Sequence, residues 1–221
     1  MIRIIGIIHV MDISSRVYSA IDYYSPSAVA IELDNKRLQA LLSNEYKRKL
    51  SITGIISYMQ RRIAMSNNII PGAEMLAAYK KAKMNDIPVF LIDDDIEEIY
   101  SKIRSIPFRE KFYIFMETFF SLPFSRKYSI DELLDNEDLM LEKFKKRYPT
   151  LFHYLLEERN RNMAKRIKEI EERYQNVLVF VGDAHLTGIK SLIPDAEIIR
   201  LKDFLKINFP NNSFNFSIRI S

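Results

Sequence analysis

Two of the three histidines follow a glycine at the same spacing. Gly6 precedes His9, and Gly182 precedes His185, each at the end of an apolar, strand-like run. Neutral imidazole is a common ligand of zinc and of other divalent metals. Because the chain has no cysteine, a metal site would need nitrogen and oxygen ligands. The repeated spacing favours a functional pair over two histidines that are merely hydrogen-bonded in the core.

Carboxylates end another strand-like run, "AVAIELD". Its alternation places Glu32 and Asp34 on one face of the expected strand. A carboxylate in a β-branched strand is costly to bury unless it meets a cation, a metal or several hydrogen-bond donors. The alternative is a pair of acids on the solvent side of a half-exposed strand.

The elements that would position these residues are strands alternating with helices. This order predicts an α/β fold with a mostly parallel or mixed central sheet flanked by helices. From about 95 to 175 the pattern is largely helical, which predicts a helical insertion or cap. Since ligands bind at the carboxyl edge of such sheets, we expect His9, Glu32 and His185 to share one cleft. The aspartates at 93 to 95 precede a helix, and we expect them to cap it.

Length and composition exclude several classes of protein. The 221 residues, 48% of them hydrophobic, can bury a full core, and we expect a single domain spanning residues 1–221. No run approaches the roughly 20 apolar residues of a membrane span, and no signal peptide is recognisable, so we expect a cytoplasmic protein. A net charge of +4 does not indicate a nucleic-acid binder. Basic clusters such as "KFKKRYP" are better interpreted as solvated helix faces.

Four blocks, in this order, resemble the TraB/PrgY family, which is related to the Tiki metalloproteases. They are "GIIHVMDISSRVYSAIDYYSPSAVAIELDNKRLQAL", "PGAEMLAAYKKAKMNDIPVFLIDDDI", "ERNRNMAKRI" and "VLVFVGDAHLTGIKSL". The resemblance implies a site containing both Gly-x-x-His motifs, Glu32, Glu74 and the pair Arg159 and Asn160. From the residues alone, Glu74 could simply favour a helix N-terminus, and Arg159 could belong to a charged helix face.

The chain departs from the family pattern at both histidine motifs. Ile7 stands where a threonine commonly follows the first glycine. Asp183 and Ala184 stand where a small residue and a glycine usually precede the second histidine. Asp183 could be an additional metal ligand. The expected ligands are therefore His9, His185, Glu32 and Asp183, and the expected catalytic residues are Glu32, Glu74, Arg159 and Asn160.

The resemblance implies a metal-dependent peptidase, because the Tiki relatives have that activity. The residue types suit manganese, cobalt or zinc, which would activate water for hydrolysis of a peptide or protein. A glutamate could move the proton, and Arg159 or Asn160 could stabilise the oxyanion. The alternative is a module that binds a peptide without cleaving it, since the bacterial relative is known for blocking a peptide pheromone.

Two further segments carry weaker expectations. The apolar run at 112–124 is expected to be a buried helix of the cap, or else a wall of a peptide groove or subunit interface. The tail at 211–221 alternates like a strand with one apolar face. Such a strand must pair with something, so we expect a homodimer to which the tail contributes.

Overall fold

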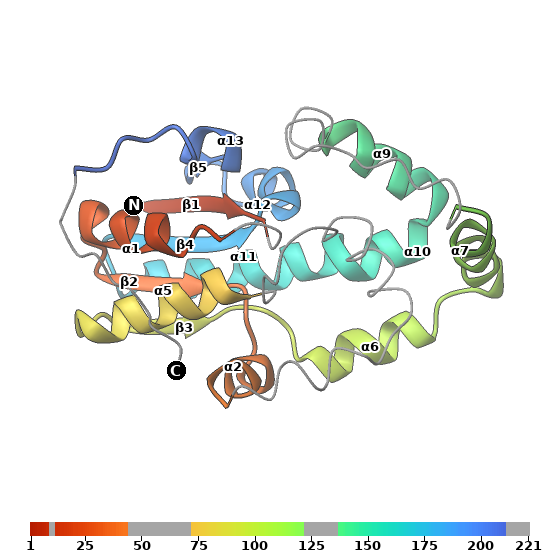
Figure 1. Ribbon diagram of the computed structural model, residues 1–221, viewed down its shortest axis with the longest axis horizontal. Helices are drawn as coiled ribbons and strands as arrows, with labels where there is room; N and C mark the ends of the chain where they lie inside the picture. Colours follow the sequence, from red (N-terminus) through yellow and green to blue (C-terminus); the bar gives the residue numbers. More distant parts are fainter. Residues whose placement is uncertain (9–11, 44–71, 122–136, 211–221) are drawn as a thin grey trace, which may run out of the picture.

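The fold is built on a parallel sheet of five strands, so the predicted α/β class is confirmed. The computed structural model describes residues 1–8, 12–43, 72–121 and 137–210. The strand order is β3-β2-β4-β1-β5 (Figure 1). The strands are β1 (Ile2–Ile7), β2 (Ala28–Ile31), β3 (Val89–Leu91), β4 (Val177–Gly182) and β5 (Glu197–Ile199).

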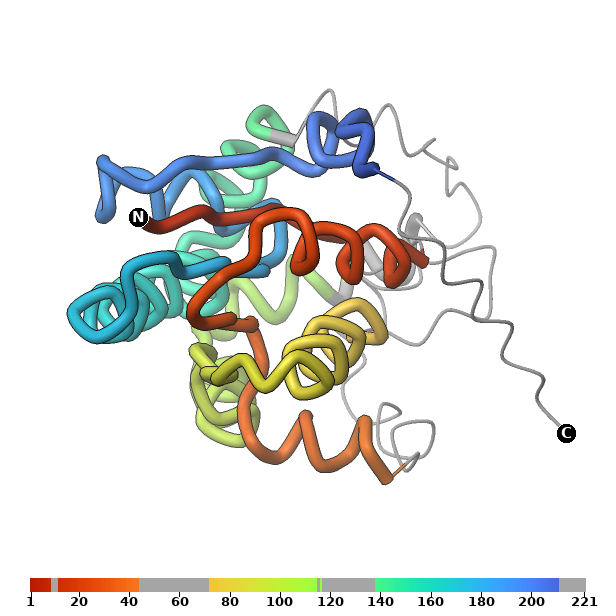
Figure 2. Tube along the Cα trace, turned by 90° about the vertical axis from the view of Figure 1, so that its left-hand side faces the viewer, coloured from red at the N-terminus to blue at the C-terminus, as the bar shows by residue number. Residues whose placement is uncertain are grey.

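Helices cover both faces of the sheet, because the chain crosses it in both directions. The connections from β1 to β2 and from β2 to β3 move toward one edge, and the later connections move back. Crossovers of one hand then place successive helices on opposite faces. As Figure 2 shows, α1 (Ser14–Tyr24) and α5 (Ala73–Met84) lie on one side and α11 (Glu158–Glu171) on the other. The last helix on the α11 side is α12 (Leu186–Leu192).

Alternate residues of the strands enter two separate apolar cores. Val29 and Phe180 pack with α1 and α5 in one core, whereas Ala30 and Val179 pack with α11 and α12 in the other. Burial on both faces explains why "VLVFVG" is continuously apolar rather than alternating.

Between β3 and β4 the chain forms a helical lobe that extends away from the sheet (Figure 1). Its own apolar core includes Ile103 and Leu151. The buried Glu110 accepts hydrogen bonds from the backbone N–H of Thr150 and of Leu151, both at 2.9 Å, and so ties two helices of the lobe together. The lobe comprises α6 (Ile96–Arg104), α7 (Phe108–Ser121), α9 (Glu137–Arg147), α10 (Pro149–Phe152) and the π-helical turn η2 (His153–Glu157).

Several expectations concern residues beyond those described. The tail at 211–221 and the end of the apolar run, 122–124, lie outside the described residues.

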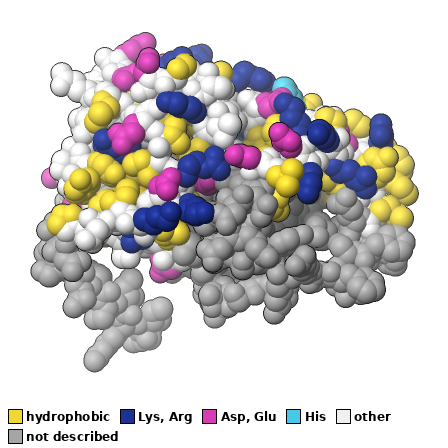
Figure 3. Space-filling view, turned by 90° about the horizontal axis from the view of Figure 1, so that it is seen from above, with side chains coloured by type: hydrophobic (Ala, Val, Ile, Leu, Met, Phe, Trp, Pro, Cys, Tyr) yellow, Lys and Arg dark blue, Asp and Glu magenta, His cyan; other side chains and the backbone are white. Residues whose placement is uncertain are grey.

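Among the described helices, none is both long and apolar enough to cross a membrane. Over the centre of the face in Figure 3, basic and acidic side chains are interspersed.

Candidate functional site

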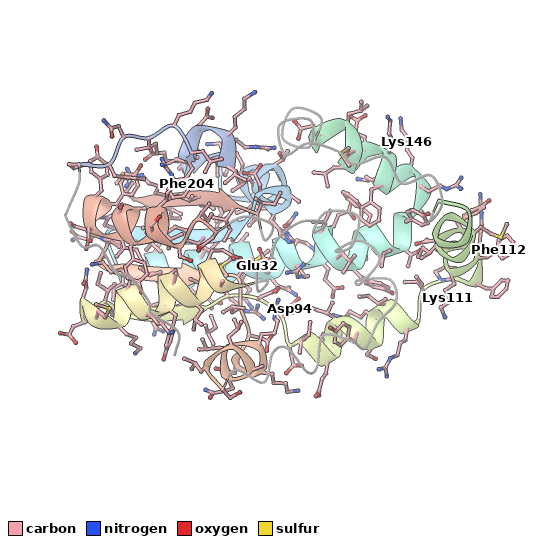
Figure 4. The ribbon with its side chains drawn as sticks, viewed as in Figure 1. Glu32, Asp94, Lys111, Phe112, Lys146 and Phe204 are labelled. Carbon is pink, nitrogen blue, oxygen red and sulfur yellow. The ribbon has the colours of Figure 1, made fainter. Side chains whose placement is uncertain are left out.

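The candidate site lies where the chain diverges at the carboxyl edge of the sheet. β2 and β4 are neighbours, but β2 leads toward β3 at one edge, whereas β4 leads across β1 to β5. Such a divergence opens a crevice in which ligands bind. Glu32, which follows β2, is only 7% exposed, and its Oε2 accepts a hydrogen bond of 2.6 Å from the backbone N–H of Gly182. Figure 4 shows Glu32 and Asp94 close to the start of the helical lobe.

His185 contacts Glu32 through one ring nitrogen and Asn160 through the other. It ends η3 (Asp183–His185), the short helical turn that follows β4. Its Nδ1 lies 2.6 Å from Asn160 Oδ1, and its Nε2 lies 3.3 Å from Glu32 Oε1. An amide oxygen only accepts, so Nδ1 carries the proton in this contact. In the neutral ring Nε2 therefore has no proton to donate to Glu32, whereas a protonated ring forms an ion pair with Glu32 Oε1.

Arg159 joins Glu32 to a second carboxylate, Asp93. Its Nη2 donates to Glu32 Oε1 at 2.5 Å and to Asp93 Oδ2 at 2.6 Å, and its Nε donates to Asp93 Oδ1 at 2.8 Å. Its Nη1 donates to the backbone oxygen of Leu155 at 2.9 Å. Leu155 belongs to η2, directly before α11, and π-helical turns occur frequently at functional sites.

Asp93 lies between two arginines and completes a chain of alternating charges. Its side chain is fully buried and also accepts from Arg37, which in turn pairs with Asp34. Burial raises the pKa of Asp93, but the charges of Arg159 and Arg37 outweigh burial and hold that pKa below 3.8, its ordinary value. Burial lowers the pKa of Arg159, but the carboxylates of Asp93 and Glu32 raise it by more, so the net shift of this pKa is upward. Asp93, Arg159 and Arg37 therefore stay charged at neutral pH.

The capping prediction for the three aspartates is right only for Asp95. Asp95 accepts a hydrogen bond of 2.8 Å from the backbone N–H of Glu97 at the start of α6. Asp93 binds the arginines instead. Asp94 accepts from Asn162 at 2.8 Å and from Arg166 at 2.9 Å, both on α11. Neither Asp93 nor Arg37 is among the site residues that the sequence predicts.

Asp34 caps a helix in addition to pairing with Arg37. It precedes α2 (Asn35–Leu42), and its Oδ1 accepts hydrogen bonds from the backbone N–H of Lys36 at 2.7 Å and of Arg37 at 3.0 Å. The cap fixes the first turn of α2, which places the Arg37 side chain over Asp93.

Asp183 is directed to another part of the sheet edge. Its Oδ1 accepts a hydrogen bond of 2.7 Å from the backbone N–H of Leu201, which begins α13 (Leu201–Phe204). Its Oδ2 lies 3.0 Å from Arg200 Nε. A Cβ at Gly6 would lie 1.9 Å from Asp183 Oδ1, so this packing requires glycine in β1. Asp183 thus joins β1, β4 and α13.

Glu74 is buried in the first turn of α5, at 2% exposure. The helix begins directly after Gly72, whose φ of 89° lies in the left-handed region that favours glycine. Because α5 and α11 cover opposite faces of the sheet, Glu74 and Arg159 approach the sheet from opposite sides.

The Glu32 and His185 pair has a separation suited to a metal ion. Two ligands that are each about 2.1 Å from one tetrahedral ion lie roughly 3.4 Å apart. Glu32 Oε1 and His185 Nε2 lie 3.3 Å apart. Within the described ranges, no group of three or more His, Asp or Glu side chains could hold a metal. His9 lies outside those ranges. β1 pairs with β4 so that Ile7 is opposite Gly182, and the glycines of both motifs therefore lie on neighbouring strands.

The fold and this cluster define an α/β protein with a buried polar site at the carboxyl edge of a parallel sheet. A sequence model of the TraB/PrgY/gumN family matches residues 1–196, and the chain belongs to that family. The expected family resemblance is thereby confirmed. The chain is also 32% identical over 206 residues to an uncharacterized protein of Methanocaldococcus jannaschii. That similarity covers 85% of this chain and 52% of the relative, so the chain spans about half of the relative's length.

Proposed function

We propose that the protein is a divalent-metal-dependent hydrolase that cleaves an amide bond in a peptide or protein. The observation that carries this proposal is the orientation of His185. Asn160 accepts from Nδ1 and leaves Nε2 directed at Glu32 Oε1, 3.3 Å away. Histidine ligands of metals typically donate their second N–H to an oxygen in this way.

In this proposal His185 and Glu32 contribute to a metal site, with His9 as the third ligand. Manganese, cobalt or zinc suits these nitrogen and oxygen donors. When bound, such an ion supplies Lewis acidity and lowers the pKa of water toward neutrality. Glu32 is proposed to accept a proton, since its Oε1 lies 3.3 Å from His185 Nε2. Asn160 fixes the tautomer of His185 and is a positioning residue in this scheme, rather than an oxyanion donor.

Three other expected residues have different roles within the proposal. Arg159 already donates to two carboxylates and one backbone oxygen, so its first role is to balance their charge. Asp183 is proposed as a ligand only if it leaves Leu201 and Arg200. Glu74 remains a proposed catalytic residue on the strength of the family resemblance.

A second candidate is a module that binds a peptide without cleaving it. The observation that favours it is the contact of 2.5 Å between Arg159 Nη2 and Glu32 Oε1. A guanidinium on this oxygen competes with a metal ion for the same lone pairs. For either candidate, a homodimer and a cytoplasmic location are further proposals, and light scattering of the purified protein tests the first of them.

A cleavage assay separates the two candidates. The full chain would be stripped of metal, reloaded with manganese, cobalt or zinc, and incubated with a mixed peptide library whose products are read by mass spectrometry. The hydrolase proposal expects cleavage that is lost in His185→Ala and kept in His153→Ala, because His153 pairs with Glu157 in the helical lobe. Peptide retention without cleavage under every metal would support the binding module instead. If neither occurs, both candidates are wrong.

A further inference from the structure

Gly188 lies three residues after His185, and residues at this spacing share one face of a helix. The turn η3, which ends at His185, runs directly into α12. The apolar residues of α12 pack with those of α11 in one core (Figure 1). Asn160 of α11 contacts His185 through Oδ1, and its Nδ2 lies over Gly188. His185 and Gly188 therefore both face the carboxamide of Asn160.

Position 188 has room for a glycine and for no larger residue while Asn160 stays in place. A Cβ at Gly188 would lie 2.1 Å from Nδ2 and 2.9 Å from Cγ of Asn160, which is closer than non-bonded atoms approach. The same Cβ would lie 3.5 Å from the Cβ of Asn160, an ordinary contact. The collision would thus be with the carboxamide and not with the backbone of α11. The backbone of Gly188 does not have a positive φ, and glycine destabilises a helix relative to alanine. Space for Asn160 is what this glycine provides.

The place of this carboxamide decides which nitrogen of His185 carries the proton of the neutral ring. Two oxygens lie near the ring: Asn160 Oδ1 is 2.6 Å from Nδ1, and Glu32 Oε1 is 3.3 Å from Nε2. The shorter contact holds the proton on Nδ1. If Asn160 were displaced, Glu32 would be left as the acceptor, and the proton would move to Nε2. A carboxylate oxygen accepts more than one hydrogen bond, so the contact of Glu32 with Arg159 does not prevent this transfer.

We propose that Gly188 is a positioning residue: by leaving room for the carboxamide of Asn160, it keeps the ring proton of His185 on Nδ1. The inference deepens the proposed function, and its importance for catalysis rests on that function, in which Nε2 must carry no proton. The contact between Asn160 and His185 does not itself require a metal, so the proposal can be tested on metal-free protein.

Nitrogen-15 NMR of the His185 ring tests the proposal on the metal-free full chain, at alkaline pH where the ring holds one proton. The chemical shifts of the two ring nitrogens report which of them is protonated. Wild type should show the proton on Nδ1, and Gly188→Ala should move it toward Nε2, as Asn160→Ala does. Thr187→Ala, at the neighbouring exposed position of α12, should leave the ring signals unchanged. Ring signals of Gly188→Ala that match those of wild type would overturn the proposal.

Combining Gly188→Ala with Asn160→Ala distinguishes this role from general damage to the packing of α12. Without the carboxamide, the nearest atom of residue 160 to the new methyl group is its Cβ, at 3.5 Å. Gly188→Ala should then raise the urea midpoint, because alanine favours a helix over glycine, and should leave the ring signals as they are in Asn160→Ala alone. In the wild-type background the same substitution should lower the midpoint. Equal shifts of the midpoint in both backgrounds would show no coupling, and the proposal would be wrong.

The outcomes separate this inference from the proposed function. If wild type retains no metal but Gly188→Ala moves the ring proton, the metal site is wrong and the role of Gly188 stands. If wild type retains metal and the ring proton of Gly188→Ala stays on Nδ1, the reverse holds. Should Gly188→Ala fail to fold, folding of the double variant with Asn160→Ala would support the collision with the carboxamide. Failure of both variants to fold would place the collision elsewhere and overturn the proposal.

Discussion

Replacing Arg159 with methionine should destabilise the protein far more than replacing the exposed Lys36 with methionine. Methionine keeps the apolar stem in both cases and removes the charge. The side chain of Arg159 is 11% exposed, and the carboxylates of Glu32 and Asp93 that it joins are 7% and 0% exposed. Breaking a buried pair in this way costs about 3–5 kcal/mol, because the remaining charge is left uncompensated.

Lys36 is the matched control, since it also pairs with an aspartate of the same run. Its side chain is 48% exposed, and that of its partner Asp95 is 45% exposed. Surface pairs of this kind contribute little to stability, because water and salt screen their charges. Arg159→Met should therefore lose a large part of a typical stability of about 5–15 kcal/mol, whereas Lys36→Met should change little.

The difference should also depend on pH in a defined direction. The pKa of Asp93 is below 3.8 in the folded protein, so its stabilisation is complete above 3.8 and is lost as the pH falls through the lowered pKa. In Arg159→Met the main cation that lowers this pKa is gone. The gap between wild type and Arg159→Met should therefore be largest near pH 7 and should narrow in acid, below about pH 4.

Urea unfolding at pH 7 and at successively lower pH, followed by circular dichroism, measures both effects. The reasoning is refuted if Arg159→Met costs no more than Lys36→Met at pH 7. It is also refuted if the gap between Arg159→Met and wild type widens as the solution is acidified.

Three further substitutions test the contacts of His185, of Asp183 and of His153. Asn160→Ala should weaken divalent-cation binding about 10–100-fold by releasing His185, whereas Asn162→Ala on the same helix should not; equal titration curves would contradict this role. Gly6→Ala should cost about 1–3 kcal/mol or more, because its Cβ would lie 1.9 Å from Asp183 Oδ1, and an unchanged urea midpoint would show that the packing is wrong. His153→Ala should change stability by less than about 1 kcal/mol and leave metal content unchanged, since its side chain is 43% exposed. A loss of bound metal would show that His153, which is not among the proposed ligands, is one.

The fold was predictable because its signals are local. Each strand is a short, mostly apolar run followed within two residues by a polar residue, as Glu32 follows β2, and the helices between strands carry their own periodicity. Parallel strands share one edge, so strand ends alone indicated that Glu32 and His185 would meet. They do meet, with Nε2 3.3 Å from Oε1.

The chain of alternating charges around Asp93 was not predictable, because its members are remote in sequence. Asp93 pairs with Arg37 and Arg159, which are 56 and 66 residues away. An aspartate just before a helix has the same local pattern whether it caps that helix or binds an arginine. Only the tertiary fold, which brings Arg37 and Arg159 to Asp93, distinguishes these two roles. Asp183 presents the same problem, since its partner Leu201 lies 18 residues further on.

Elemental analysis of the purified protein, loaded with manganese, cobalt or zinc and then dialysed, tests the metal site most directly. Wild type and His153→Ala should retain about one divalent ion per chain, as a site with three protein ligands does, whereas His9→Ala and His185→Ala should retain almost none. A wild type that retains no metal, or a His185→Ala protein that retains as much as wild type, would contradict the proposed function.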